Sequence, residues 1–192
     1  MNTRIKTDVA EEILTYDKAA NFIKFEDDNA AEKLLIEDMI AAVRTHCEIR
    51  TGLSFVEKTY ETFFRHDETP YLLPISPVIA ISKVETIDYL GAKTELTLNS
   101  DYFKKGFYDI EIIPSSMTGY ANPLTNDGSW YDLFVTYTAG YGHADTEALP
   151  IDLLEAMKRQ IAQWYDNRDD FKELNILGGI DKILLKYRTL FV

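Results

Sequence analysis

The spacing of apolar residues predicts a short helix close to the start of the chain. Thr15 can cap a helix that runs to about Lys24, because its hydroxyl can accept a hydrogen bond from a free N–H group of the first turn. Ala19, Phe22 and Ile23 would then face inward, since residues three or four apart lie on one side of a helix. The first dozen residues are polar, and we expect them to be mobile or extended.

A second, longer helix is predicted to begin near Ala30 and to end at Gly52. Asp27, Asp28 and Asn29 are cap candidates and place negative charge near the positive end of the helix dipole. Glycine just past a helix readily adopts the left-handed conformation that satisfies the last carbonyl groups. The predicted buried stripe consists of Leu35, Ile36, Met39, Ile40, Val43 and Cys47.

After residue 54 the period of the apolar pattern shortens to two, and β-branched and aromatic residues alternate with polar ones. The predicted strands of an antiparallel sheet are Thr59–Phe64, Val78–Val84, Thr94–Leu98, Tyr108–Ile113 and Leu133–Thr138. The predicted loops are Pro74–Pro77, Leu90–Lys93 and Ser115–Ser129, of which the last is long enough to be functional or disordered.

A glycine corner follows the last strand and leads into a third helix. Gly140 and Gly142 suit a chain that leaves a sheet and turns sharply. Pro150 is expected at the first helical position, because its fixed φ suits a helix, and the helix is expected to run to about Asp170. Its predicted apolar face consists of Leu154, Met157, Ile161, Trp164 and Tyr165.

A final helix is predicted after a break at residues 171–178. Its apolar side comprises Ile180, Ile183, Leu184, Tyr187, Leu190 and Phe191. A chain end that closes on Leu190, Phe191 and Val192 is unusually apolar. Either this helix folds back on the helix from Pro150, or it docks into a partner.

The order helices, sheet, helices predicts an α+β fold. We expect one domain over residues 1–192, made of an N-terminal helical part (15–52), a β-rich insertion (54–139) and a C-terminal helical part (150–192). We expect the C-terminal helices to pack back on the N-terminal helices.

Charge and cysteine content narrow the function further. The chain has 20 Lys plus Arg against 32 Asp plus Glu, a net charge of −12, which argues against a grip on the phosphate backbone of a nucleic acid. DNA could still pass nearby without sticking. Cys47 is the only cysteine, so an intrachain disulfide is excluded. We expect neither a secretory signal nor a membrane span.

No residue pattern in the chain predicts catalysis. His46, His66 and His143 lack the spacing of a metal site, and adjacent helical residues such as His46 and Cys47 point about 100° apart, which makes a poor catalytic pair. An EF-hand counted from Asp27 fails at its glycine and glutamate positions, and a dinucleotide fingerprint from Gly140 lacks its third glycine. We therefore expect no catalytic residue, no cofactor and no metal.

The order of four short motifs resembles that of a known family. These motifs are Thr136–Gly142 (TYTAGYG), Leu149-Pro150, the helix end Trp164–Arg168 and Tyr187-Arg188. Together they resemble the head-tail connector (adaptor, or head-completion) proteins of tailed bacteriophages, the gp6-like family, and especially its longer members with a β-rich middle. Upstream, Lys18, Phe22, Asp27-Asp28 and Thr51-Gly52 stand where such a protein would have them.

The resemblance implies a structural neck protein of the virion rather than an enzyme. Such a protein forms a ring, dodecameric in the virion, that docks on the portal protein and extends the DNA channel toward the tail. It would be assembled in the host cytoplasm, offer a platform to the next neck or tail-completion protein, and let DNA pass without specific binding or membrane contact.

Seven residues of the C-terminal part are the predicted partner interface. Connector proteins use this region around their portal contact, and Arg168 could bridge to a neighbouring subunit. The set is Arg168, Ile183, Leu184, Tyr187, Arg188, Leu190 and Phe191.

Two alternatives stay open at this point. The chain could be a generic soluble binding module, or another phage or prophage assembly factor that forms no ring. A small hydrolase is the weakest alternative, because it needs a convergent nucleophile, base and oxyanion site that the sequence does not offer.

Overall fold

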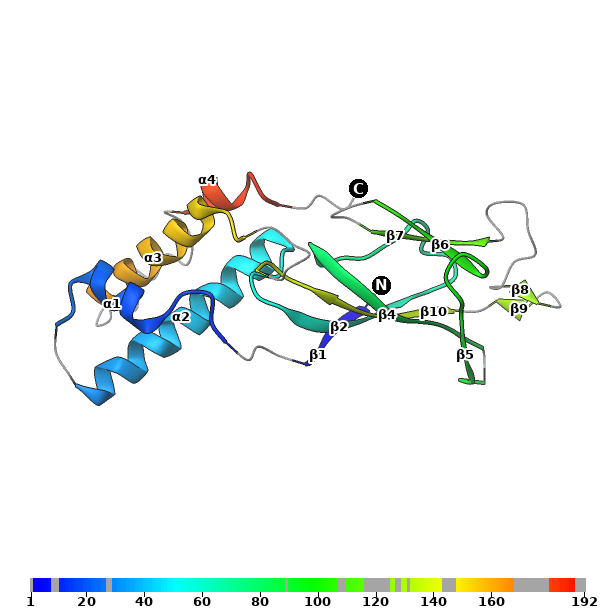
Figure 1. Cartoon of the computed structure of the whole chain (residues 1–192), viewed down its shortest axis with the longest axis horizontal. Coiled ribbons are helices and arrows are strands. Elements are labelled where there is room, and N and C mark those ends of the chain that lie inside the picture. The colour runs from blue at the N-terminus through cyan, green and yellow to red at the C-terminus, as the bar shows by residue number, and fades with distance from the viewer. Residues whose placement is uncertain are drawn as a thin grey trace. The chain divides into compact units, whose positions relative to one another are not determined.

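The computed structural model describes residues 2–7, 11–26, 29–88, 90–106, 110–115, 125–126, 129–130, 132–142, 148–167 and 180–188. The fold is α+β, as predicted, and comprises two compact units (Figure 1). A sheet unit contains Met1–Val9 and Glu57–Thr146, and a helical unit contains Ala10–Val56 and Glu147–Val192. No helix of the described residues is both long and apolar enough to cross a bilayer.

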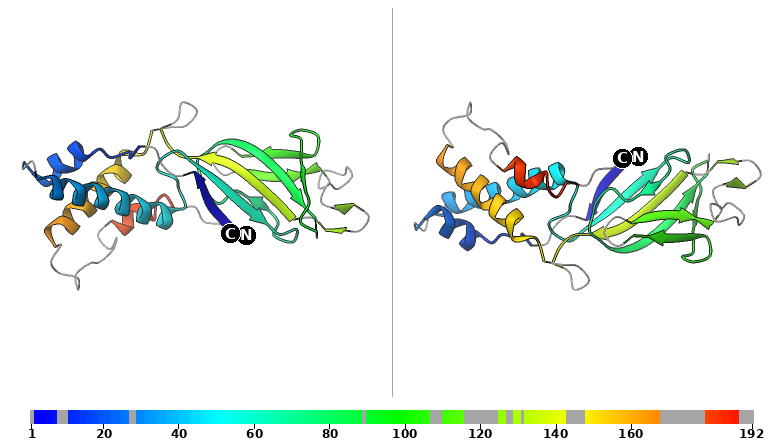
Figure 2. Two further views of the ribbon diagram at one scale, coloured as in Figure 1. Left: turned by 90° about the horizontal axis from the view of Figure 1, so that it is seen from below. Right: turned by 90° about the horizontal axis from the view of Figure 1, so that it is seen from above.

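The helical unit combines two segments that are far apart in the sequence, Ala10–Val56 and Glu147–Val192. Its helices are α1 (Tyr16–Ile23), α2 (Ala30–Thr51), α3 (Ile151–Asp166) and α4 (Asp181–Leu184). Helix α3 packs against both α1 and α2, and α4 packs against α2 and α3 (Figure 2). The prediction that the C-terminal helices pack back on the N-terminal helices is therefore confirmed.

Helix α2 has the predicted boundaries. The side chain of Asn29 accepts a hydrogen bond from the backbone N–H of Ala31 at 3.0 Å. Gly52 adopts the left-handed conformation (φ 75°) and donates its N–H to the carbonyl of Glu48. The predicted Asp27 and Asp28 caps lie outside the described residues. The buried residues of α2 are Ile36, Ile40, Val43, Arg44, Cys47, Glu48 and Thr51, while Leu35 and Met39 are half-buried.

The predicted details of α1 are partly wrong. Thr15 occupies the N-cap position, but its side chain makes no capping hydrogen bond. Phe22 is 40% exposed, and Ala20 is buried in its place beside Ala19. This short helix contacts both α2 and α3, and Lys158 of α3 lies over the ring of Phe22.

In α3 the predicted start and buried face shift by one position. Pro150 is the N-cap, and its carbonyl accepts from the N–H groups of Leu153 and Leu154. The helix ends at Asp166, and residues 168–170 lie outside the described part. The buried residues are Leu153, Ala156, Met157, Gln160 and Ile161, whereas Leu154, Trp164 and Tyr165 are half-buried. The small Ala156 thus lies in the packed stripe, which the larger aromatic residues border.

The last helix is shorter than predicted. Helix α4 ends at Leu184, and the N–H groups of Lys186 and Tyr187 then bond to carbonyls three residues earlier. Such tight turns replace the regular helix that the apolar spacing suggested. The predicted continuation through Leu190 and Phe191, and the predicted break at residues 171–178, lie outside the described residues.

The sheet unit is built from antiparallel pairs. Its strands are β1 (Asn2–Thr7), β2 (Lys58–Phe64), β3 (Tyr71–Leu72), β4 (Val78–Ile87), β5 (Lys93–Glu95), β6 (Tyr102–Lys105), β7 (Glu111–Pro114), β8 (Thr125–Asn126), β9 (Ser129–Trp130) and β10 (Asp132–Ala139). A five-stranded sheet has the order β1-β2-β10-β4-β5, a three-stranded sheet has the order β3-β7-β6, and β8 pairs with β9.

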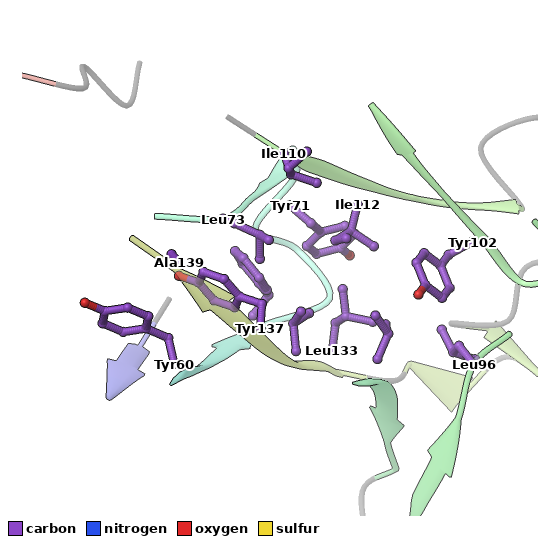
Figure 3. Packing of buried hydrophobic residues seen from close by; sticks show 13 residues of the cluster. Tyr60, Tyr71, Leu73, Leu96, Tyr102, Ile110, Ile112, Leu133, Tyr137 and Ala139 are labelled. Carbon is purple, nitrogen blue, oxygen red and sulfur yellow. The ribbon is translucent and has the colours of Figure 1, made fainter. Parts of the chain in front are cut away.

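Side chains from the two larger sheets form the core of this unit (Figure 3). Along β10, Leu133, Val135, Tyr137 and Ala139 are fully buried, as a period of two requires. The ring of Tyr137 stacks on that of Tyr60 at 5.7 Å. Ile112 and Tyr71 from the three-stranded sheet complete the same cluster.

The five strands predicted from alternation all occur, with shifted ends. The strand predicted at Val78–Val84 continues to Ile87, and the one at Thr94–Leu98 is shortened to Lys93–Glu95. The strand predicted at Tyr108–Ile113 is β7, and residues 107–109 are outside the described part. The polar strand β1 was not predicted as a strand. It is paired with β2 in an antiparallel ladder, across which Arg4 and Lys6 also make ion pairs with Glu61.

Candidate functional site

The described part of the predicted interface is a short C-terminal segment, Ile180–Arg188. Ile180 and Leu184 are buried at 3% and 0% exposure, and α4 contacts α2 and α3. Leu185, Lys186 and Arg188 are exposed, and Ile183 and Tyr187 are half-buried. As far as Arg188, the chain therefore folds back on its own helices through one apolar edge and presents the other edge outward.

An ion pair fixes the start of this segment to the end of α2. Arg50 donates from Nε and Nη2 to the two carboxylate oxygens of Asp181, at 2.7 and 3.0 Å. This hydrogen-bonded pairing lowers the pKa of Asp181, and the charge of Arg188 acts in the same direction. A two-pronged contact of this kind fixes orientation as well as position.

A second contact fixes the end of the segment to the start of α3. The hydroxyl of Tyr187 donates a hydrogen bond to Oδ1 of Asp152 in the first turn of that helix. The two contacts bracket the buried Leu184. The structure thus brings together Ile183, Leu184, Tyr187 and Arg188 of the predicted interface, whereas Arg168, Leu190 and Phe191 lie outside the described residues.

A buried ionic network on α2 was not foreseen from the sequence. Arg44 is 6% exposed and bonds to both carboxylate oxygens of Glu12, at 2.7 and 3.0 Å, and to Glu48 at 2.9 Å. Glu48 also accepts the N–H of Phe55 at 2.8 Å. Burial works against the charged guanidinium, yet its two carboxylate partners outweigh that effect and raise the pKa of Arg44. The only sequence signal was the i,i+4 spacing of Arg44 and Glu48.

A surface pocket of about 480 Å³ lies beside this network. Leu14 and Ile40 are buried residues that supply an apolar lining, and Tyr16 supplies an aromatic one. The pocket is lined by Glu11, Glu12, Leu14, Thr15, Tyr16, Glu37 and Ile40. Its carboxylates and apolar lining suit a cationic side chain that has an apolar stem.

The residues tested for chemistry occupy structural positions. Cys47 is fully buried, and burial raises the pKa of its thiol to about 12. His46 packs edge-on against Trp164, with ring centroids 5.8 Å apart. His66 contacts Asp132, and His143 lies outside the described residues. Within the described ranges, no group of three or more His, Cys, Asp or Glu is arranged to hold a metal ion.

In this α+β chain, Ala10–Val56 and Glu147–Val192 form one helical unit, and Met1–Val9 and Glu57–Thr146 form a separate antiparallel unit. No protein-family model matches the chain. No curated protein matches it by sequence either.

Solved structures of particle necks share the fold over the full chain. A chain from the neck of an empty GTA particle, computed with C6 symmetry, is 21% identical to this chain with a TM-score of 0.76. The match covers 100% of this chain and 97% of the other. A chain of the virion of the native gene transfer agent (GTA) particle is also 21% identical, with a TM-score of 0.74 and the same coverage. A chain from the neck of the native GTA particle, computed with C12 symmetry, is 23% identical with a TM-score of 0.62. The match again covers 100% of this chain and 97% of the other.

Proposed function

We propose that this chain is a structural neck protein of a phage-like particle, and that it forms a ring which docks on the portal and extends the DNA channel toward the tail. The observation that carries the proposal is the shared fold with particle-neck chains over 100% of this chain and 97% of theirs. The sequence resemblance to head-tail connectors supports the same role independently of the shared fold.

The symmetry of those neck structures and general rules of assembly support the proposed ring. Neck structures computed with C6 and C12 symmetry contain chains of this fold, which supports a ring of twelve copies. A closed ring requires a head-to-tail contact in which each subunit presents two different faces. In this role the protein works by binding alone, catalyses no reaction, and belongs to the virion after assembly in the host cytoplasm.

The division of the chain also fits a connector. The two units, Ala10–Val56 with Glu147–Val192 and Met1–Val9 with Glu57–Thr146, support a single connector domain in which helical parts at 15–52 and 150–192 flank a β-rich insertion at 54–139. The acidic balance of −12 would keep DNA sliding past the ring without specific binding, because like charges repel.

The portal contact is assigned to the exposed edge of the C-terminal segment and the residues that follow it. Ile183, Tyr187 and Arg188 are at or near the surface, and Leu190 and Phe191 extend the apolar character of the chain end. Leu184 has 0% exposure and acts as the anchor that holds this edge in place. Arg168 remains the proposed bridge to a neighbouring subunit, and the next neck or tail-completion protein would bind the completed ring.

Light scattering coupled to size-exclusion chromatography, with negative-stain images, tests this function. The protein is measured alone and with purified portal rings from the same genome. Rings, or a stable complex with the portal, are the expected result. A chain that stays monomeric and does not bind the portal would instead be a generic binding module, and the connector proposal would be rejected.

A further inference from the structure

We infer that the subunit seam of the ring forms between two oppositely charged surfaces of the helical unit: Lys182 and Lys186 of the basic C-terminal segment of one copy enter the acidic pocket of a second copy, while Ile183, Tyr187 and Arg188 are left to the portal contact. This inference rests on the proposed ring and names its contact. The occupant of the pocket is thus a second copy of this chain.

The first surface is a local concentration of positive charge. Lys182, Lys186 and Arg188 are all exposed within seven residues, and Lys182 and Lys186 share one side because they are four apart. Of the nearby carboxylates, Asp181 pairs with the cationic Arg50, whereas Asp152 accepts from the neutral hydroxyl of Tyr187 and keeps its charge. The three cations still outnumber these two carboxylates. This segment is therefore cationic in a chain whose net charge is −12.

The second surface is the pocket lined by Glu11, Glu12 and Glu37. Glu11 and Glu37 are exposed, whereas Glu12 shares Arg44 with Glu48. The other nearby cation, Lys33, lies over the ring of Tyr16 at 5.1 Å. Four carboxylates against two cations leave this region negative.

The lining of the pocket suits the side chains it would receive. Leu14 and Ile40, which are buried, give it an apolar part beside its carboxylates. Lysine and arginine bury their methylene stems against such a surface while their charged ends reach polar groups. The exposed Leu185, which lies between the cations in sequence, adds an apolar side chain to the contact.

The two surfaces lie on different sides of α2, as ring closure requires. Glu37 at the pocket and Arg50 beside α4 are separated by about 140° around the helix axis and about 20 Å along it. Figure 2 shows α1 and α4 on different sides of α2. A copy cannot fill its own pocket with its own segment, so the contact is heterologous, and a heterologous contact can close a ring.

Charge reversal tests the seam in the full-length chain. One variant carries Glu11→Lys and Glu37→Lys, a second carries Lys182→Glu and Lys186→Glu, and a third carries all four changes. Ring formation is measured by sedimentation velocity and negative stain, alone and with portal rings. Each single-surface variant is expected to associate at least about tenfold more weakly, because like charges then meet. The third variant is expected to recover assembly.

The matched control is Lys104→Glu with Lys105→Glu. This pair changes the net charge as much as the second variant does, but it lies on exposed positions of β6 in the sheet unit. It is expected to assemble like the unaltered chain. Circular dichroism of each variant verifies folding. If one double variant folds poorly, the variant with all four changes keeps the test decisive.

The outcomes separate this inference from the function on which it rests. If the unaltered chain forms rings and both single-surface variants form them equally well, the seam is wrong and the neck function stands. If the variant with all four changes is folded but does not recover ring assembly, the proposed seam is also overturned. If the unaltered chain forms no ring, either alone or with portal rings, the proposed function fails and the proposed seam fails with it.

Discussion

At the scale of single residues, the most consequential one is Arg44, because it is a buried charge with two carboxylate partners. Glu12 reaches it from the segment before α1, and Glu48 reaches it from the next turn of α2. Removing one member of a buried charged network leaves the others without compensation, which costs far more than the network contributes as a whole. The network therefore fixes how the segment before α1 lies against α2.

Replacing Arg44 by Met should destabilise the protein by about 3 kcal/mol, because Glu12 and Glu48 would be left unpaired in a partly dry environment. Urea denaturation followed by circular dichroism measures the change. Lys18→Met, an exposed substitution on α1, is the matched control and should shift stability by no more than about 0.5 kcal/mol. Equal midpoints for the two variants would show that the network does not stabilise the fold.

Cys47 should be chemically silent in the folded protein. Its sulfur is fully buried, and burial raises its pKa to about 12 from an ordinary value of 9.0, so the reactive thiolate is scarce. Titration with a thiol reagent at pH 8 should give reaction only in denaturant. Because the folded pKa is the higher one, this group's contribution to stability is complete below pH 9.0 and is lost as pH rises toward about 12. Rapid labelling without denaturant would contradict the buried placement.

At the scale of elements, α4 and the turn after it are held mainly by apolar burial, with the polar tethers fixing orientation. Leu184→Ala should weaken docking of the segment by about 2–4 kcal/mol, since a fully buried leucine is removed. Asp181→Asn should have only a small effect, because Arg50 and Asp181 are substantially exposed. Hydrogen exchange of the amides of Ile183–Tyr187 distinguishes the two. A larger effect from Asp181→Asn would mean that the ion pair holds the segment.

The Asp181 tether also has a definite pH dependence. Its pKa is lowered by the hydrogen bonds from Arg50, so the carboxylate form is favoured in the folded protein. The stabilisation is therefore complete above the ordinary aspartate pKa of 3.8 and is lost as pH falls below that value. Exchange protection of the segment should decline in acid in the unaltered chain. In Asp181→Asn this part of the decline should be missing, and an identical decline would show that other groups titrate.

How far the sequence could predict these elements depends on whether their cause is local. The ends of α2 were predictable because Asn29 and Gly52 act within one turn, and the strands were predictable because alternation reports a half-buried sheet. Strand β1 was not, because it forms by pairing with β2, which lies far along the chain. The same holds for the candidate site. The apolar spacing of Ile183, Leu184 and Tyr187 was visible in the sequence. The ion pair of Arg50 with Asp181 was not, because the two residues are 131 positions apart.

At the scale of the whole molecule, the helical unit separates an internal anchor from an exposed edge at Leu185, Lys186 and Arg188. The helical unit draws its helices from both ends of the sequence and anchors Ile180 and Leu184 inside itself. The proposed portal contact begins at the outer edge of that anchored segment. The anchor and the contact therefore depend on different residues, and a change in one can be made without changing the other.

Replacing the last four residues, Thr189–Val192, by a Gly-Ser tail of equal length should leave folding intact and abolish portal binding. The anchoring contacts of Leu184 and Tyr187 precede the replaced residues, so the thermal midpoint should change by no more than a few degrees. Portal binding should fall because Leu190 and Phe191 supply the apolar surface of the proposed contact. A pull-down on portal rings, beside a Leu190→Ile variant that keeps the apolar surface, measures this. Unchanged binding of the replaced chain would move the portal contact elsewhere, whereas lost binding with an unchanged midpoint would place it at the chain end.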